Sequence, residues 1–225
     1  MLINKDINRL YRFLLSFVLT IIVTGGVMAS SGSGYGYLAF LDSLATSSIQ
    51  GHEQGYKQVL YGAISFLASP KMDILWIVII AFFLWTIRYR IPAVWALATL
   101  LSGNVVGVIL KKIVQRPRPL LHSAADTGFS YPSGHVLGTV LVVSVIWVLL
   151  IPMLKNRRTQ IVAKTIAVIY VILVMMSRVF LNAHYPSDTV GALLVGYTWF
   201  QFCEWLYYHY AGKLNRYHPF QKSIY

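Results

Sequence analysis

The chain has 225 residues, of which 57% are hydrophobic and 12% are charged. Soluble domains carry about 25% charged residues, so this composition excludes a soluble globular protein and predicts several membrane helices of about 20 apolar residues each. The net charge of +12 suits either a nucleic-acid partner or basic loops on one side of a membrane. The single cysteine, Cys203, excludes an intramolecular disulfide, and its apolar surroundings predict a core or lipid-facing position.

The first apolar run covers residues 13–29 and follows three basic residues, Lys5, Arg9 and Arg12. This pattern predicts a membrane helix with a basic flank. A cleaved signal peptide is the rival interpretation, because residues 27–29 carry small side chains at cleavage-like positions. Residues 30–36 are rich in Gly and Ser, which predicts a flexible joint after this helix.

Residues 38–69 mix charged and apolar side chains. The apolar positions Val59, Leu60, Ile64 and Leu67 favour an amphipathic helix that lies at the outer membrane surface or packs on the bundle. We therefore expect residues 31–70 to form an outer loop and amphipathic segment.

Five further apolar runs, residues 72–87, 92–110, 135–154, 161–180 and 187–207, raise the number of predicted membrane helices to six. Six spans put both termini on the same side of the membrane. The predicted fold class is therefore all-α: a polytopic membrane protein in which residues 1–225 form a single domain, one helix bundle with an outer amphipathic segment.

The distribution of charge tests this topology. The side that holds the N-terminus carries 12 of the 19 basic residues and 2 of the 7 acidic ones, as the positive-inside rule requires of a cytoplasmic side. Five of the remaining cations crowd two connections on the opposite side: Lys111, Lys112, Arg116, Arg118 and Arg178. An anionic ligand on the outer face explains this cluster, and no nucleic-acid partner is needed.

Lys111 and Arg118 lie seven residues apart, at the exit of the third predicted helix and in the loop that follows. Pro117 and Pro119 flank the arginine, so the helix must end nearby and the guanidinium group is held on a stiff segment. Both side chains suit phosphate oxygens. Cations that only anchor the chain at the membrane interface have the same pattern.

Tyr131-Pro132-Ser133-Gly134-His135 directly precedes the fourth predicted helix. Ser133 and the Gly134 amide stand where a helix start leaves N–H groups free for an anion. His135, in the first turn, is placed to give a proton to a leaving oxygen. The alternative is an ordinary helix cap with an interfacial histidine.

The third pattern joins Arg178, His184 and Asp188. Pro186 suits the first position of the sixth helix, which puts His184 before that helix and Asp188 in its first turn. A carboxylate bound to one ring nitrogen leaves the other nitrogen as a base or nucleophile. The alternative is that Asp188 only caps the helix and favours its dipole.

Carboxylates are scarce near these histidines, where the outer face offers only Asp126 and Asp188. A two-metal site requires more oxygen ligands. We therefore expect no metal and no other cofactor, with fixed cations neutralising the charge of the ligand.

Together, the three patterns resemble the signature of the type 2 phosphatidic acid phosphatase (PAP2) family. Its motifs are Lys-x6-Arg-Pro, Pro-Ser-Gly-His and Ser-Arg-x5-His-x3-Asp. In this chain they are Lys111 with Arg118 and Pro119, then residues 132–135, then Ser177 and Arg178 with His184 and Asp188. No motif position departs from the pattern.

This resemblance implies a bacterial membrane enzyme that hydrolyses a lipid phosphate through a phosphohistidine, on the extracytoplasmic side of the cell membrane. His184 is the implied nucleophile, Asp188 orients it, and His135 protonates the leaving oxygen. The implied phosphate-binding residues are Lys111, Arg118, Ser133, Gly134 and Arg178. Undecaprenyl pyrophosphate, phosphatidylglycerophosphate and phosphatidic acid are the candidate substrates.

Two other functions fit the same sequence. One is a lipid phosphotransferase of the same fold, which passes the phosphoryl group to another lipid instead of water. The other is a non-catalytic bundle that binds or transports lipids and has kept the anion site. The sequence favours no particular oligomeric state.

Overall fold

The computed structural model describes residues 8–33, 36–50, 55–124, 126–217, 220 and 223–224. These residues form helices and loops, and none of them lies in a strand. The helices in chain order are α1 (Arg9–Ser33), α2 (Tyr37–Gln50), α3 (Gly55–Leu67), α4 (Pro70–Thr86), α5 (Arg90–Val114), α6 (Gly134–Val145), α7 (Arg157–Phe180) and α8 (Pro186–Leu214). The all-α fold expected from the sequence is confirmed.

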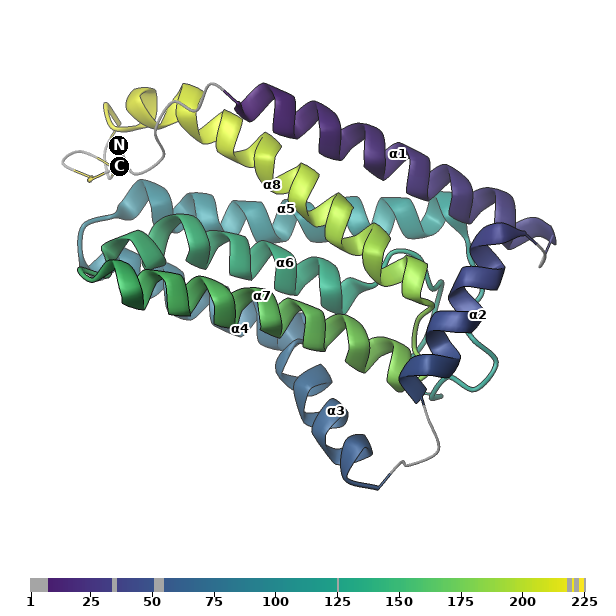
Figure 1. Ribbon diagram of the computed structural model, residues 1–225. Coiled ribbons are helices and arrows are strands. Elements are labelled where there is room, and N and C mark those ends of the chain that lie inside the picture. Colours follow the sequence, from purple (N-terminus) through teal and green to yellow (C-terminus); the bar gives the residue numbers. More distant parts are fainter. Residues whose placement is uncertain are drawn as a thin grey trace.

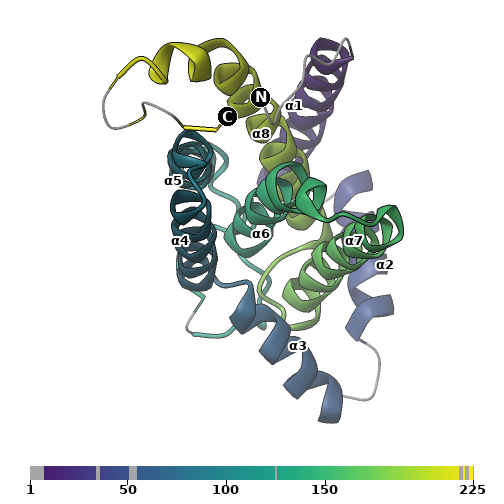
Figure 2. The same cartoon turned by 90° about the vertical axis from the view of Figure 1, so that its left-hand side faces the viewer.

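Helix α6 lies at the centre of the bundle, where it contacts α4, α5, α7 and α8 (Figure 2). Helix α1 lies at the edge and packs along α8 (Figure 1). The two shorter helices α2 and α3 stand at one end, at an angle to the long helices. The start of α1 and the end of α8 share the opposite end (Figure 1).

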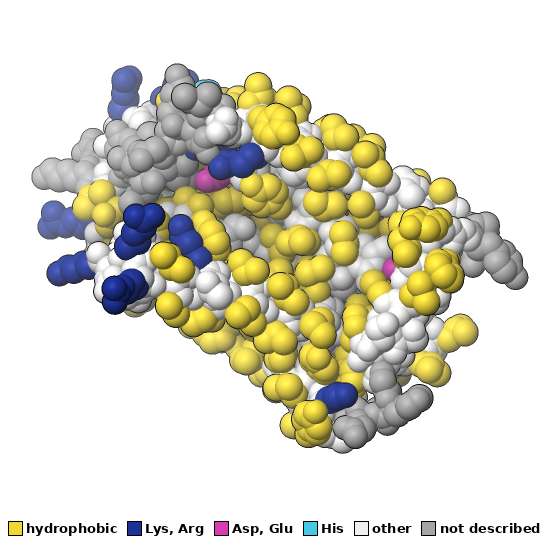
Figure 3. Space-filling model, in the orientation of Figure 1, with side chains coloured by type: hydrophobic (Ala, Val, Ile, Leu, Met, Phe, Trp, Pro, Cys, Tyr) yellow, Lys and Arg dark blue, Asp and Glu magenta, His cyan; other side chains and the backbone are white. Residues whose placement is uncertain are grey.

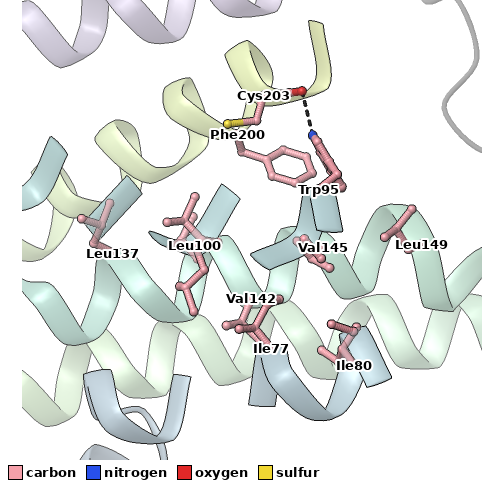
Figure 4. Packing of buried hydrophobic residues seen from close by; sticks show 14 of the residues in the cluster. Ile77, Ile80, Trp95, Leu100, Leu137, Val142, Val145, Leu149, Phe200 and Cys203 are labelled. Carbon is pink, nitrogen blue, oxygen red and sulfur yellow. Dashed lines mark hydrogen bonds between the residues drawn. The ribbon is translucent and has the colours of Figure 1, made fainter. Parts of the chain in front are cut away.

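The core joins the apolar faces of these helices (Figure 4). Trp95 of α5 packs edge-on against Phe200 of α8, with ring centroids 5.6 Å apart, and its indole N–H donates to the Cys203 carbonyl at 2.8 Å. Cys203 itself is buried, as expected. Glycines let the helices approach, because a Cβ at Gly103 would come within 2.3 Å of the Leu141 side chain.

Four described helical segments are long and apolar enough to cross a membrane: Arg9–Ser31, Arg90–Val114, Gly134–Met153 and Arg157–Phe180. A fifth span results if α3 and α4, bent by 50° at their junction, are counted as one. Helix α8 is long but less apolar, since it carries polar residues such as Gln201 and Glu204 on its buried face. The protein is thus a multi-pass membrane protein with four to five such segments.

Most predicted boundaries agree with the helices to within a few residues, and three expectations need correction. The predicted joint begins too early, because residues 30–33 continue α1 as helix, while residues 34–35 lie outside the described part. The amphipathic region 38–69 forms two helices, α2 and α3, and not one. The fourth predicted helix ends irregularly, as a π-helical turn (Ile146–Leu150) and a 3-10 turn (Ile151–Met153) follow α6.

Charge is unevenly distributed between the two ends of the bundle. Lys and Arg side chains gather at the end where α1 begins, while a broad hydrophobic surface covers the middle (Figure 3). The connections α4–α5 and α6–α7 lie at this end and contain Arg88 and Lys155, and the helices that follow begin with Arg90, Arg157 and Arg158. This pattern agrees with the basic side expected from the sequence.

Candidate active site

Four helix ends meet at the other end of the bundle, where α2 also lies (Figure 1). Helices α5 and α7 end there with Lys111 and Arg178 in their last turns. Helices α6 and α8 begin there with Gly134 and Pro186. Cations are favourable at helix C-termini and anions at helix N-termini, so this end of the bundle is a candidate site for an anion.

His184 lies between a carboxylate and a guanidinium group. Its Nδ1 is 3.6 Å from Asp188 Oδ2 and 3.4 Å from the Ser130 hydroxyl, and its Nε2 is 3.3 Å from an Arg118 nitrogen. The side chain is 3% exposed. Burial lowers the pKa of His184 to about 4, reinforced by the charges of Arg118 and Arg178 and opposed by Asp188. The imidazole is therefore neutral at pH 7, with Nε2 facing the cations.

Asp188 is fixed by several donors at the start of α8. The backbone N–H of Tyr185 donates to Asp188 Oδ2 at 2.9 Å, which closes the first turn after Pro186 as the sequence predicts. The Ser130 hydroxyl donates to the same oxygen, and Arg116 donates to Oδ1 at 2.7 Å. Because these donors satisfy a fully buried carboxylate, Asp188 can remain ionised beside the imidazole.

Arg118 and Lys111 donate hydrogen bonds to backbone carbonyls of the loops. Arg118 donates to the Ala183 carbonyl at 2.7 Å and to the Gly128 carbonyl at 3.0 Å, so it ties the first motif to the third. Lys111 Nζ donates to the Phe129 carbonyl at 2.6 Å. These bonds hold both cations at the site end and not in open solvent.

Arg178 is 4% exposed and donates to Asp126 Oδ1 at 2.7 Å and to the Ser65 hydroxyl. Its Nε is buried and has no hydrogen-bond partner among the described residues. The guanidinium group thus retains a donor for an incoming anion, and helix α3, which carries Ser65, contributes to the site.

The second motif lies against the third. The backbone N–H of Ser133 donates to the Asp188 carbonyl at 3.3 Å, which joins the starts of α6 and α8. The Ser133 hydroxyl is fully buried, makes no cap hydrogen bond, and has no partner among the described residues. His135 interacts electrostatically with His184, Arg178, Arg118 and Lys111. The ordinary helix cap considered from the sequence therefore does not describe Ser133.

The eight site residues predicted from the sequence thus gather at one end of the bundle. The structure adds four that sequence reasoning did not assign: Asp42, Arg116, Asp126 and Ser130. Arg116 belonged to the cation cluster noted in the sequence, and Asp126 was weighed only as a metal ligand. Asp42 comes from α2, 74 residues before the arginine that it contacts, so only the fold reveals the pairing.

The described residues contain no group of three or more His, Cys, Asp or Glu side chains that could hold a metal ion. The carboxylates near the histidines already bind guanidinium groups. Independence from metal ions remains a prediction.

With this geometry in place, the comparison with known proteins is decisive. The family model of the PAP2 superfamily matches residues 92–213, more than half of the chain. The chain belongs to the PAP2 superfamily.

PAP2 relatives in bacteria and archaea share the sequence at a moderate level. Phosphatidylglycerophosphatase B of Escherichia coli K12 is 26% identical over 200 residues, which cover 66% of this chain and 75% of the relative. Phosphatidylglycerophosphatase B of Bacillus subtilis is 30% identical over 102 residues, covering 42% and 48% of the two chains. Undecaprenyl-diphosphatase of Sulfolobus acidocaldarius is 26% identical over 162 residues, covering 65% and 71%.

The PAP2 fold is also shared with a solved structure. The crystal structure of the transmembrane PAP2-type phosphatidylglycerolphosphate phosphatase from Bacillus subtilis matches with a TM-score of 0.74 and 22% identity. The match covers 92% of this chain and all of that one. The family resemblance inferred from three motifs is confirmed, as is the enzyme class, a phosphoric ester hydrolase.

Proposed function

We propose that this protein hydrolyses a lipid phosphate or pyrophosphate at the outer face of the cell membrane, through a phosphohistidine at His184. The observation that carries this proposal is the two-sided environment of the His184 ring. Asp188 and Ser130 lie at Nδ1, and Arg118 lies at Nε2. A ring fixed in this way presents a neutral nitrogen to a phosphorus atom that is held by cations.

In the first step, Nε2 of His184 attacks phosphorus. A P–N bond forms while the P–O bond to the lipid breaks, and His135, which takes up a proton when the anionic substrate binds, donates that proton to the leaving oxygen. Asp188 stabilises the positive charge that develops on the His184 ring. Lys111, Arg118, Arg178, the Ser133 hydroxyl and the Gly134 amide hold the phosphoryl oxygens, because charge stabilisation supplies most of the catalysis in phosphoryl transfer.

In the second step, water attacks the phosphohistidine. His135, now neutral, accepts a proton from the water as the new P–O bond forms and the P–N bond breaks. Inorganic phosphate leaves and His184 returns to its starting state. Fixed cations neutralise the phosphate throughout, so the reaction requires no metal.

The proposed topology has six spans in a single domain over residues 1–225, with α8 as the sixth. The site lies away from the basic end of the bundle, which supports a position on the extracytoplasmic side. Residues 31–70, which include α2 and α3, would then lie on the outer surface. A lipid that stays in the outer leaflet can present its headgroup at this end.

The proposed substrates are undecaprenyl pyrophosphate, phosphatidylglycerophosphate and phosphatidic acid. The first two match the activities in the names of the relatives, phosphatidylglycerophosphatase B and undecaprenyl-diphosphatase. An outward-facing site favours recycling of a polyprenyl carrier lipid.

A panel of these three lipids, offered to purified protein in detergent, tests the proposal. We expect release of free phosphate that persists in EDTA and falls by at least about 10³-fold in His184→Ala. His122→Ala, which removes an exposed histidine of the same outer loop, is the matched control and should retain activity. A new phospholipid instead of free phosphate would indicate a transferase, and no product from any lipid would indicate a non-catalytic bundle.

A further inference from the structure

One guanidinium group joins the predicted catalytic carboxylate to a second buried carboxylate. Arg116 donates through one terminal nitrogen to Asp188 Oδ1 and through the other to Asp42 Oδ2, each at 2.7 Å. Their exposed fractions are 5% for Arg116, 4% for Asp42 and 0% for Asp188. The three groups form a chain of alternating charge that runs from helix α2 to His184.

Neighbouring groups hold Arg116 in this orientation. Its guanidinium carbon lies 4.1 Å from the centre of the Tyr185 ring. Ser187 links Arg116 to Asp42 a second time, because its hydroxyl accepts from Arg116 and donates to Asp42 Oδ2, both at 2.7 Å. The Ser187 backbone N–H donates to Asp42 Oδ1 at 2.8 Å. The carboxylate of α2 is thereby fixed to the first turn of α8.

The charges explain why Asp188 is accompanied by both Arg116 and Asp42. A buried carboxylate without a cation takes up a proton, and two carboxylates that share a site cannot both ionise. With Arg116 between them, Asp42 and Asp188 are both satisfied as anions, and the cluster has a net charge of −1. That net charge is available to the imidazolium that forms at His184 during phosphoryl transfer.

We infer that Arg116 and Asp42 are positioning residues, which act through Asp188 to keep it ionised and turned toward His184. This inference rests on the proposed function of the His184–Asp188 pair. It makes α2 a part of the catalytic unit, although α2 lies outside the three sequence motifs.

Other polar and charged groups also face the His184–Asp188 pair. Ser130 and the backbone of Tyr185 bind Asp188 directly. Lys111, Arg118, Arg178 and Tyr131 interact with the pair electrostatically. Substitutions of Arg116 and Asp42 leave all of these groups in place. Differences in activity between such variants therefore report on Arg116 and Asp42.

The test is the pH dependence of kcat/KM, measured with one lipid phosphate for wild type, Arg116→Gln, Asp42→Asn and the double variant. Because the substrate is shared, its own titration cancels between variants. In Arg116→Gln, loss of the guanidinium should move the acidic limb of the pH profile of kcat/KM to higher pH by about one to three units. The double variant restores the net charge of the cluster, so its limb should return toward wild type and its kcat/KM should exceed that of Arg116→Gln.

Lys112→Gln is the matched control, because it removes an exposed cation of α5 near the α5–α6 connection. The acidic limb of its pH profile should not move. If Arg116→Gln fails to fold, Asp42→Asn can be compared with the double variant instead. These two proteins also differ only by the Arg116 guanidinium. A uniform loss of activity without a shift of the limb, or a double variant no better than Arg116→Gln, would overturn the inference. Failure of the wild type to release phosphate would instead count against the proposed function.

Discussion

At the scale of single residues, Asp126 is the unexpected member of the site. Its carboxylate lies 2.7 Å from one nitrogen of Arg178 and 4.0 Å from one of Arg118, with the side chain 21% exposed. The proposed mechanism assigns both guanidinium groups to phosphate. Asp126 lies against terminal nitrogens of both arginines, so we expect its carboxylate to compete with the substrate phosphate for them.

We therefore expect Asp126→Asn to bind phosphate analogues more tightly. The inhibition constant of orthovanadate should fall between about threefold and about tenfold, which corresponds to roughly 1 kcal/mol for a partly exposed ion pair. Thr127→Ala, in the same loop, is the control and should leave the constant unchanged. Weaker vanadate binding in Asp126→Asn would mean that the carboxylate orients the arginines and does not compete with phosphate.

The buried histidine makes stability depend on pH. The pKa of His184 is about 4 in the folded chain, compared with about 6.5 in an unfolded one. Because the unfolded chain binds the proton first, His184 costs stability as pH falls from about 6.5 to about 4. The thermal transition of His184→Gln should fall less between pH 7 and pH 5 than that of wild type. An equal fall in both proteins would contradict this.

The sequence predicted the eight site residues because they fall in three ordered motifs at or near helix ends, which together match one family. The residues that hold them in place had no such signal. Asp42 looked like a charge in a surface helix, and Arg116 looked like one more cation of a crowded loop. Their pairing depends on the approach of α2 to α8, which no local pattern of residues encodes.

At the scale of secondary structure, the site is made by helix ends. Helices α5 and α7 supply cations from their last turns, α6 begins beside them with Gly134 after Ser133, and α8 supplies Asp188 from its first turn. The long apolar runs made these helices predictable, since their ends coincide with Pro, Gly and charged residues. The division of residues 38–69 into α2 and α3 was not predicted, because amphipathic spacing alone does not mark where a helix breaks.

Close packing sets the position of the second motif. Tyr131 is fully buried, bonds to Thr24 at 2.7 Å, and lies so near Gly191 that a Cβ there would come within 2.2 Å of its ring. Gly191→Ala should therefore displace Tyr131 and the adjoining segment up to His135. We expect a loss of about 1–3 kcal/mol of stability, together with reduced kcat.

Thermal unfolding and phosphate release measure these two effects. Gly62→Ala is the matched control, because an added Cβ there meets nothing within 4 Å. It should leave kcat unchanged and raise stability slightly, since alanine is the better helix former. A Gly191→Ala variant as stable and active as wild type would show that Tyr131 is not needed to position the motif.

At the scale of the whole molecule, the two ends of the bundle differ in charge and in role. The basic end is the expected cytoplasmic side, and the site lies at the other end. The sequence predicted this division from the order of the apolar runs, tested against the distribution of Lys and Arg. It also predicted six spans, whereas four to five described segments pass the test of length and apolarity. Helix α8 fails because of its polar buried face, and α4, with 17 residues, passes only together with α3.

Cysteine labelling tests the orientation. In a variant with Cys203→Ser as background, we expect Leu121→Cys, an 80% exposed position of the site end, to react with a membrane-impermeant maleimide in intact cells. Lys155→Cys, in the α6–α7 connection, should react only after the cells are broken. The reverse pattern would place the site on the cytoplasmic side.

The central claim is that His184 carries the phosphoryl group during turnover. Rapid alkaline quenching of the enzyme during hydrolysis of ³²P-labelled p-nitrophenyl phosphate measures this directly, because phosphohistidine survives alkali and this leaving group needs little help from an acid. The account predicts label on the peptide that contains His184, more of it in His135→Gln, where water attack is slowed, and none in His184→Gln. Label on another residue, or steady phosphate release by His184→Gln, would contradict it.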